Sequence, residues 1–119
     1  MDARPKRAYE PAAPSEDHRV LIVRIWPRRV TREEAHVDEW ARELAPSGKS
    51  RRWFGHHPGR FDEFGQRYTE VLAAQKRKLR ELRSCAGEGT LRLVYGARDT
   101  EHNDAIVLAE ILRRRRRSL

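Results

Sequence analysis

Arginine and aromatic side chains follow the two most apolar segments of this chain. Residues 20–23 read Val-Leu-Ile-Val, and residues 91–94 read Leu-Arg-Leu-Val. The side chains that follow are Arg24, Trp26 and Arg28 after the first segment, and Tyr95 and Arg98 after the second. A guanidinium group is a planar fork that matches two oxygens of a phosphate or a carboxylate. If the fold brings both segments to one edge of a sheet, these residues predict a site for a small anionic ligand.

Two further segments supply aromatic and polar candidates. A connection at 46–59 is rich in rings and cations, and it contains Trp53 and His56, with Tyr68 following it. Residues 99–103 precede a predicted helix whose free amide groups favour an anion. The complete predicted set of ligand-binding residues is Arg24, Trp26, Arg28, Trp53, His56, Tyr68, Tyr95, Arg98, His102 and Asn103.

Each of these side chains also has a structural interpretation. The arginines can pair with carboxylates such as Asp99, Glu101 or Asp104 and so hold the strand ends. Aromatic side chains provide the largest burial per residue in a core. A histidine or an asparagine with satisfied hydrogen bonds is common in any fold. The residues alone leave both interpretations open.

Metal and thiol chemistry have little support. Among the histidines, His56 and His57 are adjacent and point apart, and no compact ligand motif accompanies them. Cys85 is the single cysteine and lies before the second apolar segment. We therefore expect no metal and no cofactor. The residues do not decide whether a reaction is catalysed, and they identify no catalytic group.

Length and charge bound the class of protein. The chain has 119 residues, enough for one domain with its own core. Its net charge is +8, and Arg113 to Arg117 contribute five positive charges, which leaves +3 on the rest. One cysteine, no apolar leader and no membrane-spanning run predict a cytoplasmic protein that does not enter a membrane.

Residue patterns predict the elements that position the site. A short edge strand is expected at 6–9 and a core strand at about 19–26. Thr31 and Glu34 form a capping box, which predicts a helix that ends at Pro46. Residues 46–59 read as a loop and about 60–83 as one long helix. A strand at 91–95, a tight turn and a last helix capped by Asp99 or Thr100 complete the chain.

This order predicts an α/β fold. Strands separated by helices, without a two-residue hairpin, indicate a small three-layer-like domain. It would have a short, mostly parallel sheet of about three strands flanked by three main helices. In open parallel sheets, ligands bind beyond the carboxyl ends of the strands. We expect one domain at 1–112, with 1–5 disordered, and a basic C-terminal tail at 113–119.

Five blocks of residues occur in a fixed order between Lys6 and about Leu112. They are 6–11 (Lys-Arg-Ala-Tyr-Glu-Pro); 19–28 (Arg-Val-Leu-Ile-Val-Arg-Ile-Trp-Pro-Arg); 45–47 (Ala-Pro-Ser) with 52–56 (Arg-Trp-Phe-Gly-His); Phe64 with 67–68 (Arg-Tyr); and 93–99 (Leu-Val-Tyr-Gly-Ala-Arg-Asp) with 101–103 (Glu-His-Asn) and Ala105. In this order they resemble the YeaO-like proteins, a bacterial family classed as a domain of unknown function. The resemblance implies a compact, cytosolic α/β domain and supplies no reaction.

Two positions depart from the YeaO-like pattern. The family usually has an aspartate before the first motif arginine, where this chain has Val23, and a glycine after the second, where it has Arg29. If that aspartate is a catalytic acid or base in relatives, this chain lacks it. Longer relatives in the wider superfamily place a cysteine at the end of the final core strand, and this chain has Gly96 or its neighbours there. Both comparisons argue against hydrolytic and sulfur chemistry here.

Two functions from different classes follow. The first is an arginine- and aromatic-lined pocket at the carboxyl ends of the strands that binds a phosphate- or carboxylate-bearing small molecule. The alternative is a basic accessory or regulatory protein that binds nucleic acid through its tail and the loop at Arg51 and Arg52. The tail residues are Arg113, Arg114, Arg115, Arg116 and Arg117. The alternative predicts an affinity that falls steeply with salt. A third interpretation, an aromatic loop that binds a partner protein, predicts nothing as sharp.

Overall fold

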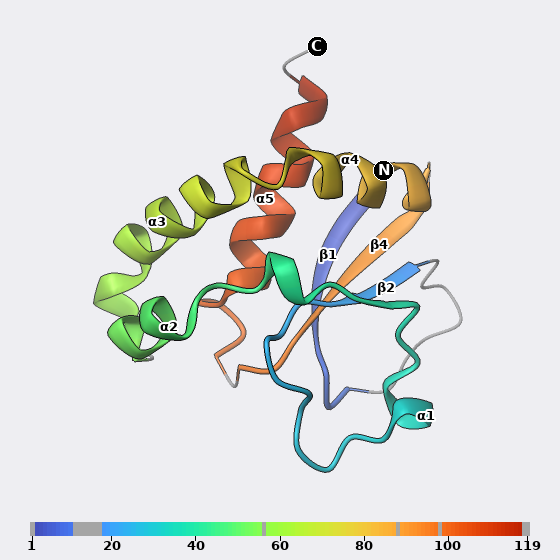
Figure 1. The fold of residues 1–119 in the computed structure, drawn as a ribbon, viewed down its shortest axis with the longest axis horizontal. Helices are drawn as coiled ribbons and strands as arrows, with labels where there is room; N and C mark the ends of the chain where they lie inside the picture. Colours follow the sequence, from blue (N-terminus) through green and yellow to red (C-terminus); the bar gives the residue numbers. More distant parts are fainter. Residues whose placement is uncertain (1, 11–17, 56, 88, 98, 118–119) are drawn as a thin grey trace.

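The computed structural model describes residues 2–10, 18–55, 57–87, 89–97 and 99–117 (Figure 1). Its strands are β1 (Asp2–Arg7), β2 (His18–Leu21), β3 (Glu39–Trp40) and β4 (Thr90–Tyr95). Its α-helices are α1 (Arg32–Ala35), α2 (Gly48–Phe54), α3 (Phe61–Ala73), α4 (Lys76–Ala86) and α5 (Asp104–Arg117), with short 3-10 turns at Arg42–Leu44 and Pro58–Arg60. The strands form one sheet in the order β1-β4-β2-β3, and each of its three pairings is parallel. The predicted α/β class with a parallel sheet is confirmed, with four strands where about three were expected.

The two faces of the sheet are covered differently. The larger core lies on one face, where alternate residues of β4, Leu91 and Leu93, pack with side chains of α3, α4 and α5 such as Leu72, Leu82 and Leu108. The opposite face carries a smaller cluster of Ala8, Leu21 and Val94, covered by Val23, Trp26, Val37 and Trp40. Helices α3, α4 and α5 therefore cover one face, and the segment between β2 and β3, which contains α1, covers the other.

β1 forms an edge of the sheet and begins earlier than predicted. Asp2 to Arg7 pair in register with Thr90 to Tyr95 of β4. The expected disorder of residues 1–5 is therefore wrong for residues 2–5. Pro5 fits this strand because an edge strand does not need every amide donor.

The helix predicted between Thr31 and Pro46 is wrong beyond its first turn. The capping box of Thr31 and Glu34 is present, but α1 ends at His36, whose φ is 48°. The buried guanidinium group of Arg19 forms hydrogen bonds with the carbonyl groups at this end of the helix. It donates from Nε and Nη2 to the carbonyl of Ala35 (3.2 and 2.8 Å) and from Nε to the carbonyl of His36 (3.1 Å). The chain then extends to pair with β2.

The predicted loop at 46–59 contains a helix. Ser47 accepts a hydrogen bond from the amide of Ser50 at 3.1 Å and caps α2, and Gly55, with φ at 52°, ends it. A serine cap and a terminal glycine are ordinary helix signals that the unusual composition of this segment obscured.

The two remaining helical predictions are right in place and wrong in their ends. The helix predicted at about 60–83 is interrupted at Ala74 and Gln75, which divides it into α3 and α4. α5 begins at Asp104, and Asn103, rather than Asp99 or Thr100, caps it by accepting a hydrogen bond from the amide of Ile106 at 3.1 Å. α5 continues to Arg117, so the backbone of 113–117 is part of the helix.

No helix in the described part of the chain is long and apolar enough to cross a membrane.

Candidate functional site

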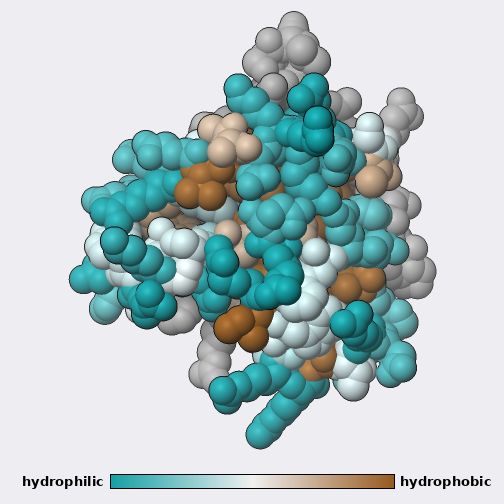
Figure 2. All heavy atoms as spheres, viewed as in Figure 1, coloured by the Kyte–Doolittle hydropathy of each residue, from teal (hydrophilic) through white to brown (hydrophobic). Residues whose placement is uncertain are grey.

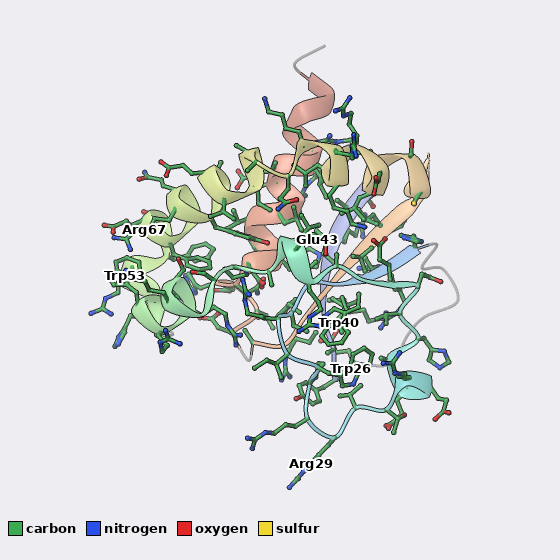
Figure 3. The ribbon with its side chains drawn as sticks, in the orientation of Figure 1. Trp26, Arg29, Trp40, Glu43, Trp53 and Arg67 are labelled. Carbon is green, nitrogen blue, oxygen red and sulfur yellow. The ribbon has the colours of Figure 1, made fainter. Side chains whose placement is uncertain are left out.

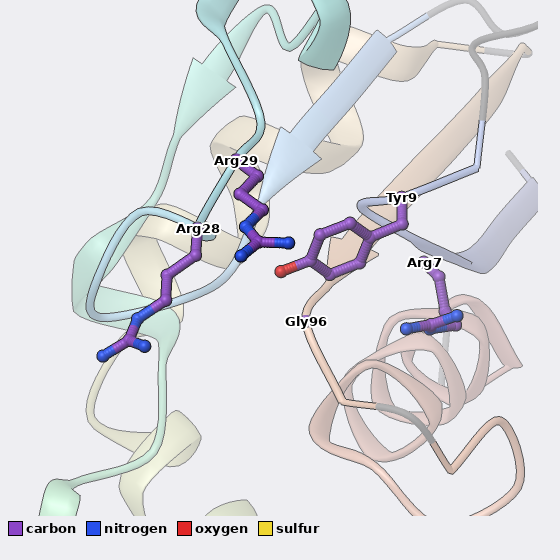
Figure 4. Close-up of a pocket in the computed structure, with 5 residues that line it drawn as sticks. All are labelled: Arg7, Tyr9, Arg28, Arg29 and Gly96. Carbon is purple, nitrogen blue, oxygen red and sulfur yellow. The ribbon is translucent and has the colours of Figure 1, made fainter.

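Three segments meet beyond the carboxyl ends of the parallel strands. β1 ends at Arg7 and β4 ends at Tyr95, while the loop after β2 returns towards both. An open hollow of about 300 Å³ lies here, lined by Arg7, Tyr9, Arg28, Arg29 and Gly96 (Figure 4). This is the edge of a parallel sheet at which ligands are generally bound.

Arg7 and Tyr9 form the β1 side of the hollow. The amide of Ala8 donates to the carbonyl of Tyr95 at 2.7 Å, which continues the pairing of β1 with β4 for one more residue. Arg7 donates from Nε to the carbonyl of Ala97 at 3.0 Å, and its guanidinium carbon lies 5.3 Å from the centre of the Tyr9 ring. Tyr9 is 49% exposed. Arg7 is thus held in place over the Tyr9 ring, and about half of the Tyr9 surface remains open to solvent.

Arg28 and Arg29 form the opposite side. Figure 4 shows the Arg29 side chain directed towards Tyr9 and the Arg28 side chain extending in another direction. Both are exposed, and neither has a hydrogen bond or an ion pair with any residue that the structure describes. Arg29 has a φ of 62°, a conformation that favours glycine. Within the described residues, Arg28 and Arg29 therefore have no acidic partner at this edge.

The loop that carries these arginines is fixed by tryptophans. Trp26 donates from Nε1 to the carbonyl of Val30 at 2.5 Å, which closes the loop across Arg28 and Arg29. The Trp26 and Trp40 rings meet edge to face, with 5.3 Å between their centres. Figure 3 shows the two side chains next to one another. Trp40 in turn donates to the carbonyl of Val23 at 2.6 Å. Trp26, a predicted ligand residue, therefore supports the loop and does not line the hollow.

Arg24 lies apart from the hollow. It is exposed, and its Nε is 3.4 Å from the carbonyl of Pro46. Arg98 and His56 fall outside the described residues. The predicted meeting of Arg24 with Arg98 therefore lies outside the described residues, and of the two predicted arginines that the structure describes, Arg28 lines the hollow.

The aromatic candidates of the second segment lie on the helical side of the molecule. Trp53 of α2 packs against the guanidinium groups of Arg67 and Arg60, at 4.2 and 5.6 Å from the ring centre (Figure 3). Tyr68 is a core residue whose hydroxyl donates to the carbonyl of Leu44. Burial raises the pKa of Tyr68 well above its ordinary value, and the charge of Asp104 adds to this shift.

Tyr95 is close to the hollow but buried. Its side chain packs in the main core at the end of β4. Burial raises its pKa, Glu10 raises it further and Arg7 opposes the shift. Tyr95 therefore remains a neutral phenol beneath the edge where Arg7 lies.

The loop between β4 and α5 forms its own hydrogen-bonded unit. Asp99 accepts from the amides of Glu101 (2.9 Å) and His102 (3.1 Å), and the Nδ1 of His102 is 2.9 Å from its carboxylate. The Glu101 amide is the main cause that lowers the pKa of Asp99, so the carboxylate that accepts these hydrogen bonds is ionised. Asn103 is buried and donates to the carbonyl of Asp99 at 2.9 Å. His102 and Asn103 are thus engaged in shaping the loop.

Three residues that line the hollow were not predicted, although the position of one of them could have been inferred from the sequence. Arg7, Tyr9 and Arg29 were not among the predicted ligand residues. Arg7 ends an edge strand parallel to β4, so the rule applied to the core strands would also have placed it at this edge.

Within the described residues, no group of three or more His, Cys, Asp or Glu side chains is arranged to hold a metal ion.

Comparisons with known proteins place the chain in a family. The family model described as the inactive DUF488-N3 subclade matches residues 2–118. The uncharacterised protein Rv3073c of Mycobacterium tuberculosis (strain H37Rv) is 39% identical over 106 residues, which cover 89% of each chain. The uncharacterised protein YeaO of Escherichia coli K12 is 34% identical over 113 residues, which cover 95% of this chain and 98% of YeaO. No solved structure matches this chain. The chain therefore belongs to the YeaO-like family of proteins, within the inactive DUF488-N3 subclade.

Proposed function

We propose that this protein binds a small molecule bearing a phosphate or carboxylate group at the hollow beyond β1 and β4, and that it does so without catalysing a reaction. The observation that carries the proposal is that Arg7 and Arg29 lie on opposite sides of an exposed tyrosine ring, at a hollow that Arg28 also lines. An anion is the ligand class that three guanidinium groups recognise.

One arginine of the hollow is held by a hydrogen bond, and the other two can bind a ligand directly. Arg7 is restrained by its bond to Ala97, and its remaining guanidinium nitrogens offer donors. Arg29 and Arg28 have no described partner to release before they bind an anion. Tyr9 offers a ring face and a hydroxyl between the two sides, so an anionic group attached to a planar moiety fits this hollow.

The absence of catalysis is proposed on two grounds. The family description itself reads inactive. Among the described residues that line the hollow, none is a carboxylic acid, an imidazole or a nucleophile with a neighbouring base, so these residues offer no candidate for general acid or base catalysis.

Isothermal titration with inorganic pyrophosphate and with citrate at low ionic strength tests the proposal. We expect saturable binding by the wild-type protein. The double variant Arg28→Gln with Arg29→Gln should bind about tenfold more weakly, because each lost charged contact at an exposed site is worth about 1 kcal/mol or less. The double variant Arg77→Gln with Arg80→Gln removes two exposed arginines of α4 and is the matched control.

The control distinguishes a site from general charge. If both double variants weaken binding equally, the anions respond to net charge and the proposed site is wrong. If neither anion binds the wild-type protein at millimolar concentration, the hollow is not an anion site.

A further inference from the structure

Tyr9 is the residue of the hollow that an inorganic anion leaves without a role. Among the described residues, the large exposed hydrophobic side chains are Tyr9, Ile25 and Val71, and Tyr9 is the aromatic one and the one that lines the hollow. The guanidinium carbon of Arg7 lies over the Tyr9 ring, 5.3 Å from its centre, and a cation in this position holds the ring in its orientation. The open part of the ring is therefore a fixed, flat apolar surface at an anion site.

Gly96 keeps the hollow open beside this ring. Its φ is not positive, so the backbone conformation does not require glycine here. A Cβ built at Gly96 would meet, among the described residues, a single atom within 4 Å, the Cγ1 of Val23 at 3.8 Å, which is an ordinary contact. The packing of the fold therefore leaves room for a side chain at this position. With glycine, that space remains part of the hollow.

The hollow is larger than a single phosphate group requires. Its volume of about 300 Å³ corresponds to about ten water molecules at about 30 Å³ each, and it lies at the lower end of the range for small-molecule sites. Figure 4 shows the guanidinium group of Arg29 beside the hydroxyl end of Tyr9. Figure 2 shows hydrophilic side chains projecting from the loop between β2 and α1, at the lower edge of the molecule in this view. The flat surface and the cations are thus adjacent, and a ligand that uses both has a planar part next to an anionic part.

We infer that the ligand of the proposed anion site is a mononucleotide, whose base stacks on Tyr9 and whose phosphate binds Arg29 and Arg28. This inference rests on the proposed function, because it assigns a class of ligand to the same hollow. Every nucleobase has a π face, so stacking on an aromatic side chain accepts purines and pyrimidines alike. The planar fork of a guanidinium group matches two oxygens of the phosphate.

The lining of the hollow favours a mononucleotide over two other kinds of anion. An aliphatic anion such as citrate would leave the Tyr9 ring uncovered. A single strand of nucleic acid is bound by several aromatic side chains, on which successive bases stack. Among the described residues that line the hollow, Tyr9 is the one aromatic side chain, so the hollow has a stacking surface for one base.

Isothermal titration with three related ligands at low ionic strength tests the inference. Adenosine 5′-monophosphate and ribose 5-phosphate share the phosphate and differ by the base, and adenosine has the base without the phosphate. We expect the wild-type protein to bind adenosine 5′-monophosphate about tenfold more tightly than ribose 5-phosphate, because one stacked base contributes an energy of this size. Adenosine should also bind about tenfold more weakly than adenosine 5′-monophosphate, because it forms no charged contact with the arginines.

Variants of Tyr9 test whether this residue supplies the stacking surface. Tyr9→Leu should lower the affinity for adenosine 5′-monophosphate to that for ribose 5-phosphate, whose own affinity should change little and so reports that the hollow is intact. Tyr9→Phe keeps the ring and should keep the preference for the base. Trp53→Leu removes a half-buried aromatic ring on the helical side of the molecule and is the matched control, which should bind all three ligands as the wild type does.

The outcomes separate this inference from the proposed function. Equal affinity of the wild-type protein for adenosine 5′-monophosphate and ribose 5-phosphate would overturn the inference and leave the anion site in place. A preference for the base that persists in Tyr9→Leu, or that is lost equally in Trp53→Leu, would also overturn it, because the base would then bind away from Tyr9. If ribose 5-phosphate, adenosine 5′-monophosphate and pyrophosphate all fail to bind, the proposed function is wrong and the inference fails with it.

Discussion

Replacing Arg29 with glycine should separate ligand binding from folding. Arg29 has a φ of 62°, a region in which a residue with a Cβ is strained by about 1 kcal/mol. Glycine avoids this strain but has more freedom in the unfolded chain, a loss of about 0.5 to 1 kcal/mol. The two terms nearly cancel. We therefore expect the free energy of unfolding of Arg29→Gly to equal that of the wild type, or to exceed it by up to about 0.5 kcal/mol.

The same substitution removes a cation from the hollow. An exposed charged contact is worth about 1 kcal/mol, so the Kd for pyrophosphate should rise about fivefold. Arg29→Gln should show the same change in Kd with wild-type stability, because it keeps a Cβ at this position. Arg29→Val should lose about 1 to 2 kcal/mol of stability, since a β-branched side chain is poorly tolerated at positive φ.

Urea denaturation and calorimetric titration of the three variants provide the test. A loss of more than about 2 kcal/mol in Arg29→Gly would refute the assignment of a left-handed, exposed residue. An unchanged Kd in both Arg29→Gly and Arg29→Gln would show that Arg29 does not contact the anion. The glycine that YeaO-like proteins usually have at this position is consistent with the conformation, and it makes the Arg29 cation a feature of this chain.

Three further predictions concern groups inside the fold. Arg19→Met should lower the free energy of unfolding by about 3 kcal/mol in urea denaturation, because the carbonyl of Ala35 and its neighbour lose a buried charged donor; an effect below about 1 kcal/mol would contradict the capping role. Burial raises the pKa of Asp104 from 3.8 to about 6, so ionisation of this carboxyl group opposes folding. The protonated carboxyl group therefore contributes to the free energy of unfolding below pH 3.8, and this contribution is lost as the pH rises through about 6. Asp104→Asn should therefore remove about 1 to 3 kcal/mol of pH dependence between pH 4 and 7, read as the difference from the wild type, and parallel curves would refute the shift. Tyr68→Phe should cost about 1 to 2 kcal/mol by leaving the carbonyl of Leu44 unsatisfied, without changing the Kd for pyrophosphate; a weaker Kd would return Tyr68 to the ligand site.

The fold was predictable where burial imposes a clear pattern. The apolar runs before Arg24 and Tyr95 identified the two central strands, and the connections between them indicated parallel pairing, which the structure confirms. The helix predicted between Thr31 and Pro46 was wrong because of contacts with residues that are distant in the sequence. Arg19 binds the carbonyls that would have continued the helix, and Trp40 packs on the sheet instead of along a helical face. The spacing of apolar residues along a segment carries no information about a hydrogen-bond partner elsewhere in the chain.

The candidate site was predictable in place and only partly in composition. Ligand-binding residues were expected beyond the carboxyl ends of the strands, and the hollow at Arg28 lies there. Arg7 was missed because β1 is an edge strand interrupted by Pro5, which weakens its sequence signal. Trp26 and Tyr68 were taken as ligand candidates, but both satisfy a backbone carbonyl. Aromatic residues with polar tips serve either role, and sequence alone does not distinguish them.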